Sequence, residues 1–144
     1  MEEFYNFSTF LADLEKVERL GVGKVEGILA IARGGLTFAH FLAEKLQVRA
    51  VYGIPISTYF NRQKVTSPVL SSLPDLSHFS SILVVDDIAD TGETLELVVK
   101  TLTTSYPLLK ITTFTLFWKP TSQFKPDFYF HTTTRWVHFF WERE

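Results

Sequence analysis

The chain has 144 residues, of which 46% are hydrophobic and 21% are charged, an ordinary composition for a globular protein. We therefore expect one domain over residues 1–144 with a core of its own. Lysine and arginine number 14 against 16 aspartates and glutamates, a formal charge of -2, so no nucleic acid is expected as the main partner. The absence of cysteine excludes disulfides, thiolate metal sites and a cysteine nucleophile.

The first residues and the longest apolar segments indicate where in the cell the protein is expected. Met1–Glu3 is acidic where a secretory signal would be basic. The longest apolar runs, Gly27–Ala32 and Ile82–Val85, are too short to span a bilayer. The sequence therefore predicts a protein without membrane insertion, located in the cytoplasm.

The first part of the chain alternates between helical and strand patterns. Apolar residues at helical spacing predict a helix from Phe7 to Val17, closed by Gly21. We then expect, in chain order, a buried strand over Val25–Ile31, a break at Arg33–Gly35, a helix over Leu36–Leu46 and a strand over Val48–Ile56.

From Asn61 to Ser80 the chain is polar and lacks clear periodicity, which predicts either a disordered segment or a functional lid. Patterns typical of strands and helices resume at Ser81. We expect a strand over Ile82–Val85, a turn over Asp86–Gly92, a helix over Glu93–Leu102, a strand over Ile111–Trp118 and a further short strand at Phe128–Phe130. This alternation predicts an α/β domain with a mainly parallel central sheet flanked by helices.

Three loops with unusual chemistry follow predicted strands: Ala32–Gly35, Asp86–Thr94 and Lys119–Pro120. In parallel sheets, ligands bind in the crevice beyond the carboxyl ends of the strands. We therefore expect these loops to form one site. By contrast, the four histidines, at positions 40, 78, 131 and 138, show no spacing typical of a metal cluster.

The segment Asp86–Thr94 is the most informative of the three. A strand delivers two carboxylates, and a turn with hydroxyls and a glycine then enters a helix, which is typical of a phosphate cradle. The adjacent carboxylates suit sugar hydroxyls or Mg²⁺. The candidate phosphate contacts in this segment are Asp86, Asp87, Ala89, Asp90, Thr91, Gly92, Glu93 and Thr94.

Two alternatives compete with this interpretation. Asp90 with Glu93 forms the pattern of a helix capping box. Leu83–Asp87 with Lys119–Pro120 also resembles parts of a response-regulator receiver domain. A receiver needs an intermediate phosphorylatable aspartate, however, and no aspartate lies between Asp90 and Lys119.

An apolar strand, two acidic residues and then Asp-Thr-Gly and a hydroxyl resemble the phosphoribosyl-diphosphate (PRPP) motif of type I phosphoribosyltransferases, and bacterial xanthine-guanine enzymes are the most similar group. The resemblance implies a flexible catalytic loop at about residues 57–80, a small hood, and a purine-binding region at about residues 117–144. Ala32–Leu36 resembles the family's pyrophosphate loop, with Arg33, Gly34 and Gly35 as contacts and a cis peptide bond before Arg33.

The same resemblance assigns the purine pocket to Lys119, Trp136 and Val137. A lysine only donates hydrogen bonds, so it suits the 6-oxo group of guanine, xanthine or hypoxanthine. Trp136 would stack on the base, and the Val137 carbonyl would accept from a 2-amino group. Two positions depart from the family pattern: Ala32 replaces a frequent serine, and Glu93 places an acidic group in the phosphate loop.

The implied reaction is displacement of pyrophosphate from PRPP by a purine, as in purine salvage. Mg²⁺ would be the cofactor, with Asp86 and Asp87 as its candidate ligands, and Asp90 the candidate base for the purine proton. A homo-oligomer, a dimer or a tetramer, is expected from the family. Two other functions stay open: a regulator that senses PRPP or nucleotides on the same fold, and a phosphoribosyltransferase for another base.

Overall fold

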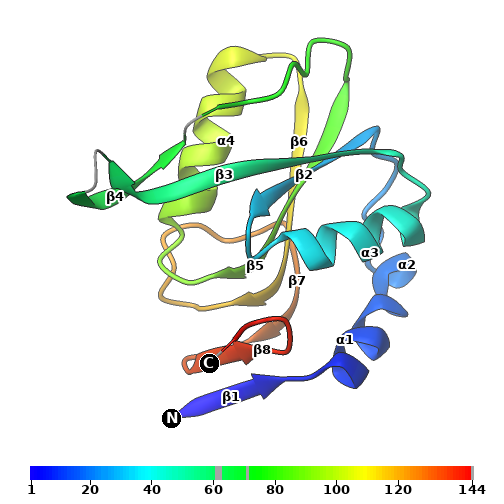
Figure 1. Cartoon of the computed structure of the whole chain (residues 1–144). Helices are drawn as coiled ribbons and strands as arrows, with labels where there is room; N and C mark the ends of the chain where they lie inside the picture. Colours follow the sequence, from blue (N-terminus) through cyan, green and yellow to red (C-terminus); the bar gives the residue numbers. More distant parts are fainter. Residues whose placement is uncertain (61–62, 71, 144) are drawn as a thin grey trace.

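A computed structural model of the chain describes residues 1–60, 63–70 and 72–143. Its centre is a six-stranded sheet in the order β4-β3-β2-β5-β6-β7, parallel except for the pair β3 and β4 (Figure 1). The strands are β2 Gly27–Ala32, β3 Ala50–Phe60, β4 Gln63–Leu70, β5 Ser81–Ala89, β6 Lys110–Trp118 and β7 Phe128–Thr132. The predicted α/β class and the mainly parallel central sheet are confirmed.

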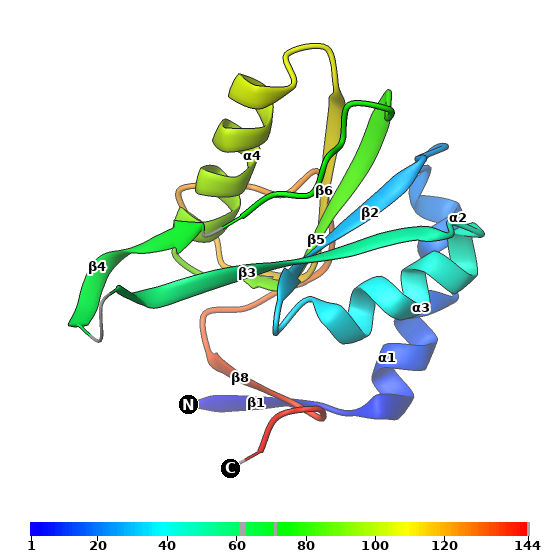
Figure 2. The ribbon, with the colours of Figure 1, turned by 45° about the horizontal axis from the view of Figure 1, so that its top comes forward.

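A second, two-stranded sheet joins the ends of the described chain. Its strands β1 Glu2–Tyr5 and β8 Trp136–Phe139 run parallel, with Glu2 opposite Trp136. We call this two-stranded sheet the hood. It lies beyond the carboxyl end of β5 in both ribbon views (Figures 1 and 2). Neither strand was predicted from the sequence.

The helices cover both faces of the central sheet. They are α1 Phe7–Leu14, α2 Val17–Leu20, α3 Leu36–Leu46 and α4 Glu93–Ser105. The strand period of two sends Leu83 and Val85 into the core with α1 and α3, and Ile82 and Val84 into the core with α4. Figure 2 shows α4 on one side of the sheet and the other helices on the opposite side.

Several predicted boundaries hold and others shift. The helix over Leu36–Leu46 is confirmed as α3. The single helix predicted from Phe7 to Val17 is instead two, α1 and α2, and Gly21 ends α2 in the left-handed region at φ 70°. The polar segment Asn61–Ser80, where no regular element was predicted, contains strand β4, Gln63–Leu70, which pairs with β3. Asn61, Arg62 and Ser71 lie outside the described residues.

The strand β5 is longer than predicted, and this changes the setting of the two carboxylates. It continues to Ala89, so Asp86 and Asp87 lie within the strand and not in a turn. The reason is that the pairing with β6 continues beyond the predicted end of the strand, with Asp86 opposite Thr115 and Ala89 opposite Trp118. In the part of the chain that the structure describes, no helix is long and apolar enough to cross a membrane.

Candidate active site

The three predicted loops meet at the carboxyl edge of the central sheet, because β2, β5 and β6 are neighbours. The Lys119 backbone N–H donates to the Ala89 carbonyl at 3.0 Å, and the Gln123 N–H donates to the Thr91 carbonyl at 2.8 Å. The turn after β6 therefore packs directly on the turn after β5. On the other side of β5, a Cβ on Gly35 would lie 2.5 Å from the Val85 carbonyl oxygen, so only glycine fits there.

The turn between β5 and α4 encloses a small cavity of about 80 Å³. Gly92, the N-cap of α4, has φ 86°, and a Cβ there would overlap Ser122 and Phe124. Glycine therefore meets two demands at this position, a left-handed backbone and a close approach. Helix N-terminal N–H groups attract anions, and the cavity is lined by Asp86, Ile88, Ala89, Asp90, Thr91, Gly92, Thr94 and Leu95.

Glu93 does not line this cavity. It lines a separate hollow with Glu96, Lys100, Pro68, Leu97 and Gln123. The capping-box alternative is wrong, because the N-cap is Gly92 and no side chain caps the helix. The nearest substitute is the Thr91 hydroxyl, which accepts from the Glu93 N–H at 3.3 Å. The carboxylate of Glu93 is thus directed to the flank of α4.

The two adjacent carboxylates sit between the first two loops. Asp86 is buried, and burial followed by the charge of Asp87 raises its pKa well above the ordinary value. Burial also raises the pKa of Asp87. A Cβ on Gly34 would overlap the Asp87 carboxylate, which brings the Arg33–Gly35 loop against this side chain. The peptide bond between Ala32 and Arg33 is cis, as the resemblance implied.

Asp90 forms an ion pair with Lys119. The Lys119 Nζ lies 3.1 Å from Asp90 Oδ1, and the side chains are 15% and 49% exposed, respectively. Ala89 at the end of β5 pairs with Trp118 at the end of β6, so the residues that follow them, Asp90 and Lys119, lie side by side. The structure therefore joins the predicted base and the predicted purine-binding lysine, two groups that the sequence separates by a helix and a strand.

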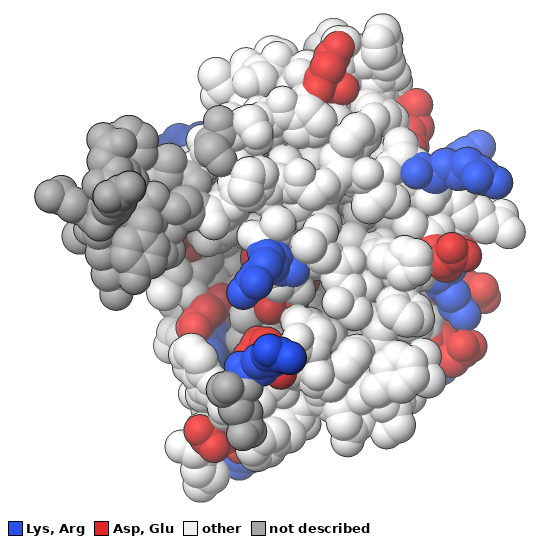
Figure 3. All heavy atoms as spheres, in the orientation of Figure 1, with Lys and Arg blue, Asp and Glu red and all other residues white. Residues whose placement is uncertain are grey.

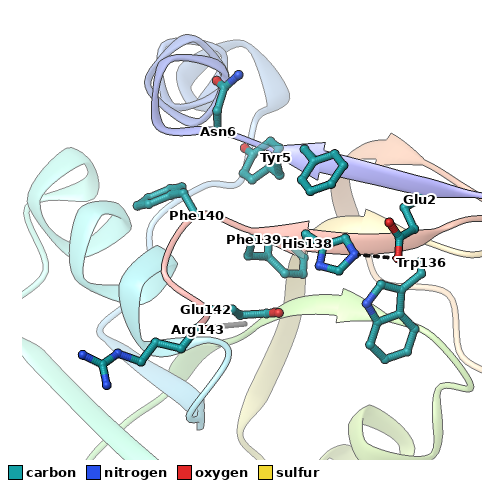
Figure 4. Close-up of a pocket in the computed structure, with 10 residues that line it drawn as sticks. Glu2, Tyr5, Asn6, Trp136, His138, Phe139, Phe140, Glu142 and Arg143 are labelled. Carbon is teal, nitrogen blue, oxygen red and sulfur yellow. Dashed lines mark ion pairs between the residues drawn. The ribbon is translucent and has the colours of Figure 1, made fainter.

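Trp136 and Val137 lie in the hood and face opposite ways. Trp136 is 60% exposed, whereas Val137 is buried in the core. Trp136 opens onto a cavity of about 730 Å³ between the hood and the C-terminal segment, and Figure 4 shows His138 and Glu142 turned toward the same space. Lys119 is not among the residues that line this cavity.

Glu142 and Arg143 line this cavity as well, although neither was a candidate site residue from the sequence. Both also line a hollow of about 800 Å³ with Arg33, Gly34 and Thr37, so the C-terminal segment lies beside the predicted pyrophosphate loop. Figure 3 shows basic and acidic side chains gathered in a depression on this face. Burial and the charge of Asp87 raise the pKa of Glu142. No motif marks these positions, because their place depends on how the chain end folds back.

Asp86 and Asp87 are the candidates for holding Mg²⁺, and their chemistry fits. Carboxylate oxygens are the ligands that this ion prefers. Asp86 Oδ1 accepts from the Asp87 N–H at 2.8 Å and Asp87 Oδ1 from the Ile88 N–H at 2.7 Å, which orients both groups. Among the described residues, no group of three or more histidine, aspartate or glutamate side chains could hold a metal alone, so further oxygens would come from substrate or water.

Comparisons with known proteins agree with this geometry. A phosphoribosyl transferase domain matches residues 14–144. The xanthine-guanine phosphoribosyltransferase of Cereibacter sphaeroides is 31% identical over 125 residues, which cover 83% of this chain and 71% of the relative. That of Ruegeria sp. is 32% identical over 136 residues, covering 85% and 73% of the two chains.

A solved structure supports the same conclusion over nearly the whole chain. The xanthine-guanine-hypoxanthine phosphoribosyltransferase of Helicobacter pylori superposes with a TM-score of 0.88 at 35% identity, covering 99% of this chain and 94% of the other. The receiver-domain alternative is therefore wrong. The chain belongs to the type I phosphoribosyltransferase family and is close to its bacterial xanthine-guanine members.

Proposed function

We propose that the protein is a purine-salvage phosphoribosyltransferase. It transfers the 5-phosphoribosyl group of PRPP to a 6-oxopurine, giving the nucleoside monophosphate and pyrophosphate. The observation that carries this proposal is the Asp90–Lys119 pair at 3.1 Å, next to the phosphate-sized cavity of the β5–α4 turn. The relatives named for xanthine, guanine and hypoxanthine support the choice of base.

PRPP would lie along the carboxyl edge of the sheet. Its 5-phosphate would lie in the turn of Thr91, Gly92 and Thr94, where backbone N–H groups and hydroxyls would donate to it. Asp86 and Asp87 precede this turn at the end of β5 and would accept hydrogen bonds from the ribose hydroxyls. The pyrophosphate would take the backbone N–H groups of Arg33 and Gly34 and the guanidinium of Arg33. The Gly35 N–H instead donates to the Ile31 carbonyl at 2.8 Å, so Gly35 would contribute close approach of the backbone and not a donor.

Mg²⁺ is the proposed cofactor, held through Asp86 and Asp87. When bound, it supplies charge neutralisation of the leaving pyrophosphate. Burial raises the pKa of both aspartates, and the charge of Asp87 raises that of Asp86 further. A cation bound by these carboxylates would favour their ionised forms.

The base would insert its 6-oxo and N7 edge into the Asp90–Lys119 pair. Lys119 donates to the 6-oxo oxygen, and Asp90 accepts the N7 proton. The purine N9–C1′ bond forms as the bond from C1′ to the pyrophosphate oxygen breaks, with positive charge on the ribose between the two. Adenine would meet Lys119 with an amino group, two donors without an acceptor, and is therefore disfavoured.

The hood would hold the other side of the base. Trp136 offers an exposed ring for stacking, worth about 1–3 kcal/mol. The Val137 backbone carbonyl would accept from a 2-amino group. The β3–β4 hairpin would be the lid that excludes water from the reacting centre.

We further propose a homo-oligomer, a dimer or tetramer, located in the cytoplasm. Light scattering on the purified protein tests the first point and fractionation of cells the second. A sensor of PRPP or a phosphoribosyltransferase for another base would share the same phosphate half of the site. They differ in the base half.

Purified protein incubated with PRPP, Mg²⁺ and one base at a time tests the function. The bases are guanine, xanthine, hypoxanthine, adenine, uracil and orotate, with nucleotide and pyrophosphate measured. We expect turnover with 6-oxopurines alone. Turnover of another base would overturn the Lys119 and Trp136 assignments, and PRPP binding without any turnover would favour a sensor.

A further inference from the structure

A buried carboxylate that the proposed reaction does not use lies where the hood meets the central sheet. Asp13, in α1, is 1% exposed and has three polar neighbours. The Tyr5 hydroxyl donates to Oδ2 at 2.5 Å, His131 Nε2 lies 2.7 Å from the same oxygen, and Lys16 Nζ lies 3.0 Å from Oδ1. A carboxylate so deeply buried needs such partners to remain ionised.

The balance of these effects keeps Asp13 charged. Burial raises its pKa, but the hydrogen bonds from His131, Tyr5 and Lys16 outweigh burial and bring the pKa below the ordinary value. Burial and the bond to Asp13 in turn raise the pKa of Tyr5. Because an ionised carboxylate only accepts hydrogen bonds, both Tyr5 and His131 donate to it.

The partners come from elements far apart in the chain. Tyr5 ends β1, Asp13 belongs to α1, and His131 belongs to β7, the edge strand of the central sheet. The Tyr5 ring also packs edge-on against Phe117 of β6, with ring centroids 5.2 Å apart. The cluster therefore fastens the end of β1 to both β7 and β6.

The position of β1 determines the position of the base-binding strand. Tyr5 pairs with Phe139 and Glu2 with Trp136 along the hood. A second hydrogen bond holds the middle of β1: the Thr133 hydroxyl donates to the Glu3 carboxylate at 2.9 Å. Tyr5 itself lines the cavity onto which Trp136 opens (Figure 4).

We propose that Asp13 is a positioning residue for the purine base. With Tyr5 and His131 it fixes the hood relative to the end of β6, and so fixes the distance between Trp136 and Lys119. Three directional donors on one buried carboxylate define a single position, which apolar contacts alone define less sharply. The inference rests on the proposed function only in naming the ligand that the hood positions.

Tyr5→Phe tests the proposal because it removes one hydroxyl and keeps the ring. We expect KM for guanine to rise about fivefold, with kcat and KM for PRPP changed less than twofold. Tyr106→Phe is the matched control, since the Tyr106 hydroxyl accepts from the Leu76 N–H at 3.1 Å in a part of the molecule away from the hood. It should lower Tm without moving either KM.

A pair of substitutions at His131 separates the hydrogen bond from ring packing. Gln retains an N–H donor in place of Nε2, so His131→Gln should keep KM for guanine within twofold of the wild type. His131→Leu should raise it as Tyr5→Phe does. Equal changes in both KM values, or a loss of Tm with neither KM changed, would show a merely structural cluster.

Hydrogen exchange of the protein without ligands provides a readout that does not depend on activity. Tyr5→Phe should speed amide exchange in residues 2–5 and 136–139 at least tenfold and leave residues 82–95 unchanged. Tyr106→Phe should leave the hood unchanged. If the wild type turns over no base, the proposed function fails, while the exchange pattern still tests whether Asp13 and its partners position the hood. An equal increase in exchange rate across the whole chain in Tyr5→Phe would overturn that positioning role.

Discussion

The phosphate half of the site comes from turns that follow adjacent strands, whereas the base half is assembled from the two ends of the chain. In the first, a strand, a turn and a helix N-terminus over Ser81–Ser105 already contain the cradle. In the second, Trp136 owes its place to pairing with Glu2. A local motif is therefore robust to changes elsewhere, while the base half depends on contacts at a distance.

The largest expected effect is on the chemical step, where the two halves meet. Asp90→Asn should lower kcat by about 100- to 10,000-fold, the range for a lost general base, with little change in PRPP affinity. Steady-state kinetics and calorimetric PRPP titration measure the two. Asp75→Asn, at an exposed carboxylate that accepts from the Ser77 N–H at 3.0 Å, is the control. An unchanged kcat would remove Asp90 as the base.

A change confined to the phosphate half should affect PRPP alone. In Gly34→Ala the new methyl group would collide with the Asp87 carboxylate, and a displacement of about 1 Å costs about 100-fold in kcat/KM. KM for guanine at saturating PRPP should stay the same. Gly53→Ala, whose Cβ would meet only the end of the Leu36 side chain at 3.2 Å, should behave as wild type. Equal losses for both substrates would contradict separate halves.

A change confined to the hood should affect the base alone. Trp136→Ala removes a stacking surface worth about 1–3 kcal/mol, so KM for guanine should rise about 5- to 150-fold. Trp136→Phe retains an aromatic face and should fall between that variant and the wild type. Kinetics with each substrate varied in turn would show the pattern. A matching rise in KM for PRPP would mean that the ring does not bind the base.

The smallest effect concerns the link between hood and sheet. The pKa of Asp13 is lowered on folding, so its stabilisation is present above the unfolded pKa of about 3.9 and is lost as pH falls through the lower folded pKa. Asp13→Asn should reduce the free energy of unfolding by about 1–3 kcal/mol at pH 7. Urea titrations should show this gap shrinking toward pH 3. A gap independent of pH would mean that the carboxylate is not ionised in the native state.

The same comparison explains what could be predicted from the sequence. The turn from Asp90 to Thr94 and the loop Arg33–Gly35 are each an unbroken run of residues, so the sequence alone shows their chemistry. The extension of β5 to Ala89 was missed because it depends on pairing with Trp118. The sequence also could not show Glu142 beside Arg33, or Asp13 bonded to a residue 118 positions away. Such contacts follow from packing and not from a local pattern.

The central claim is that the Asp90–Lys119 pair receives the edge of a 6-oxopurine. A crystal structure of the protein with GMP tests it most directly. We expect the phosphate in the Thr91–Thr94 turn, the guanine ring against Trp136, and the 6-oxo oxygen within hydrogen-bond distance of Lys119 Nζ. GMP bound with its base away from an unchanged Asp90–Lys119 pair would contradict the account.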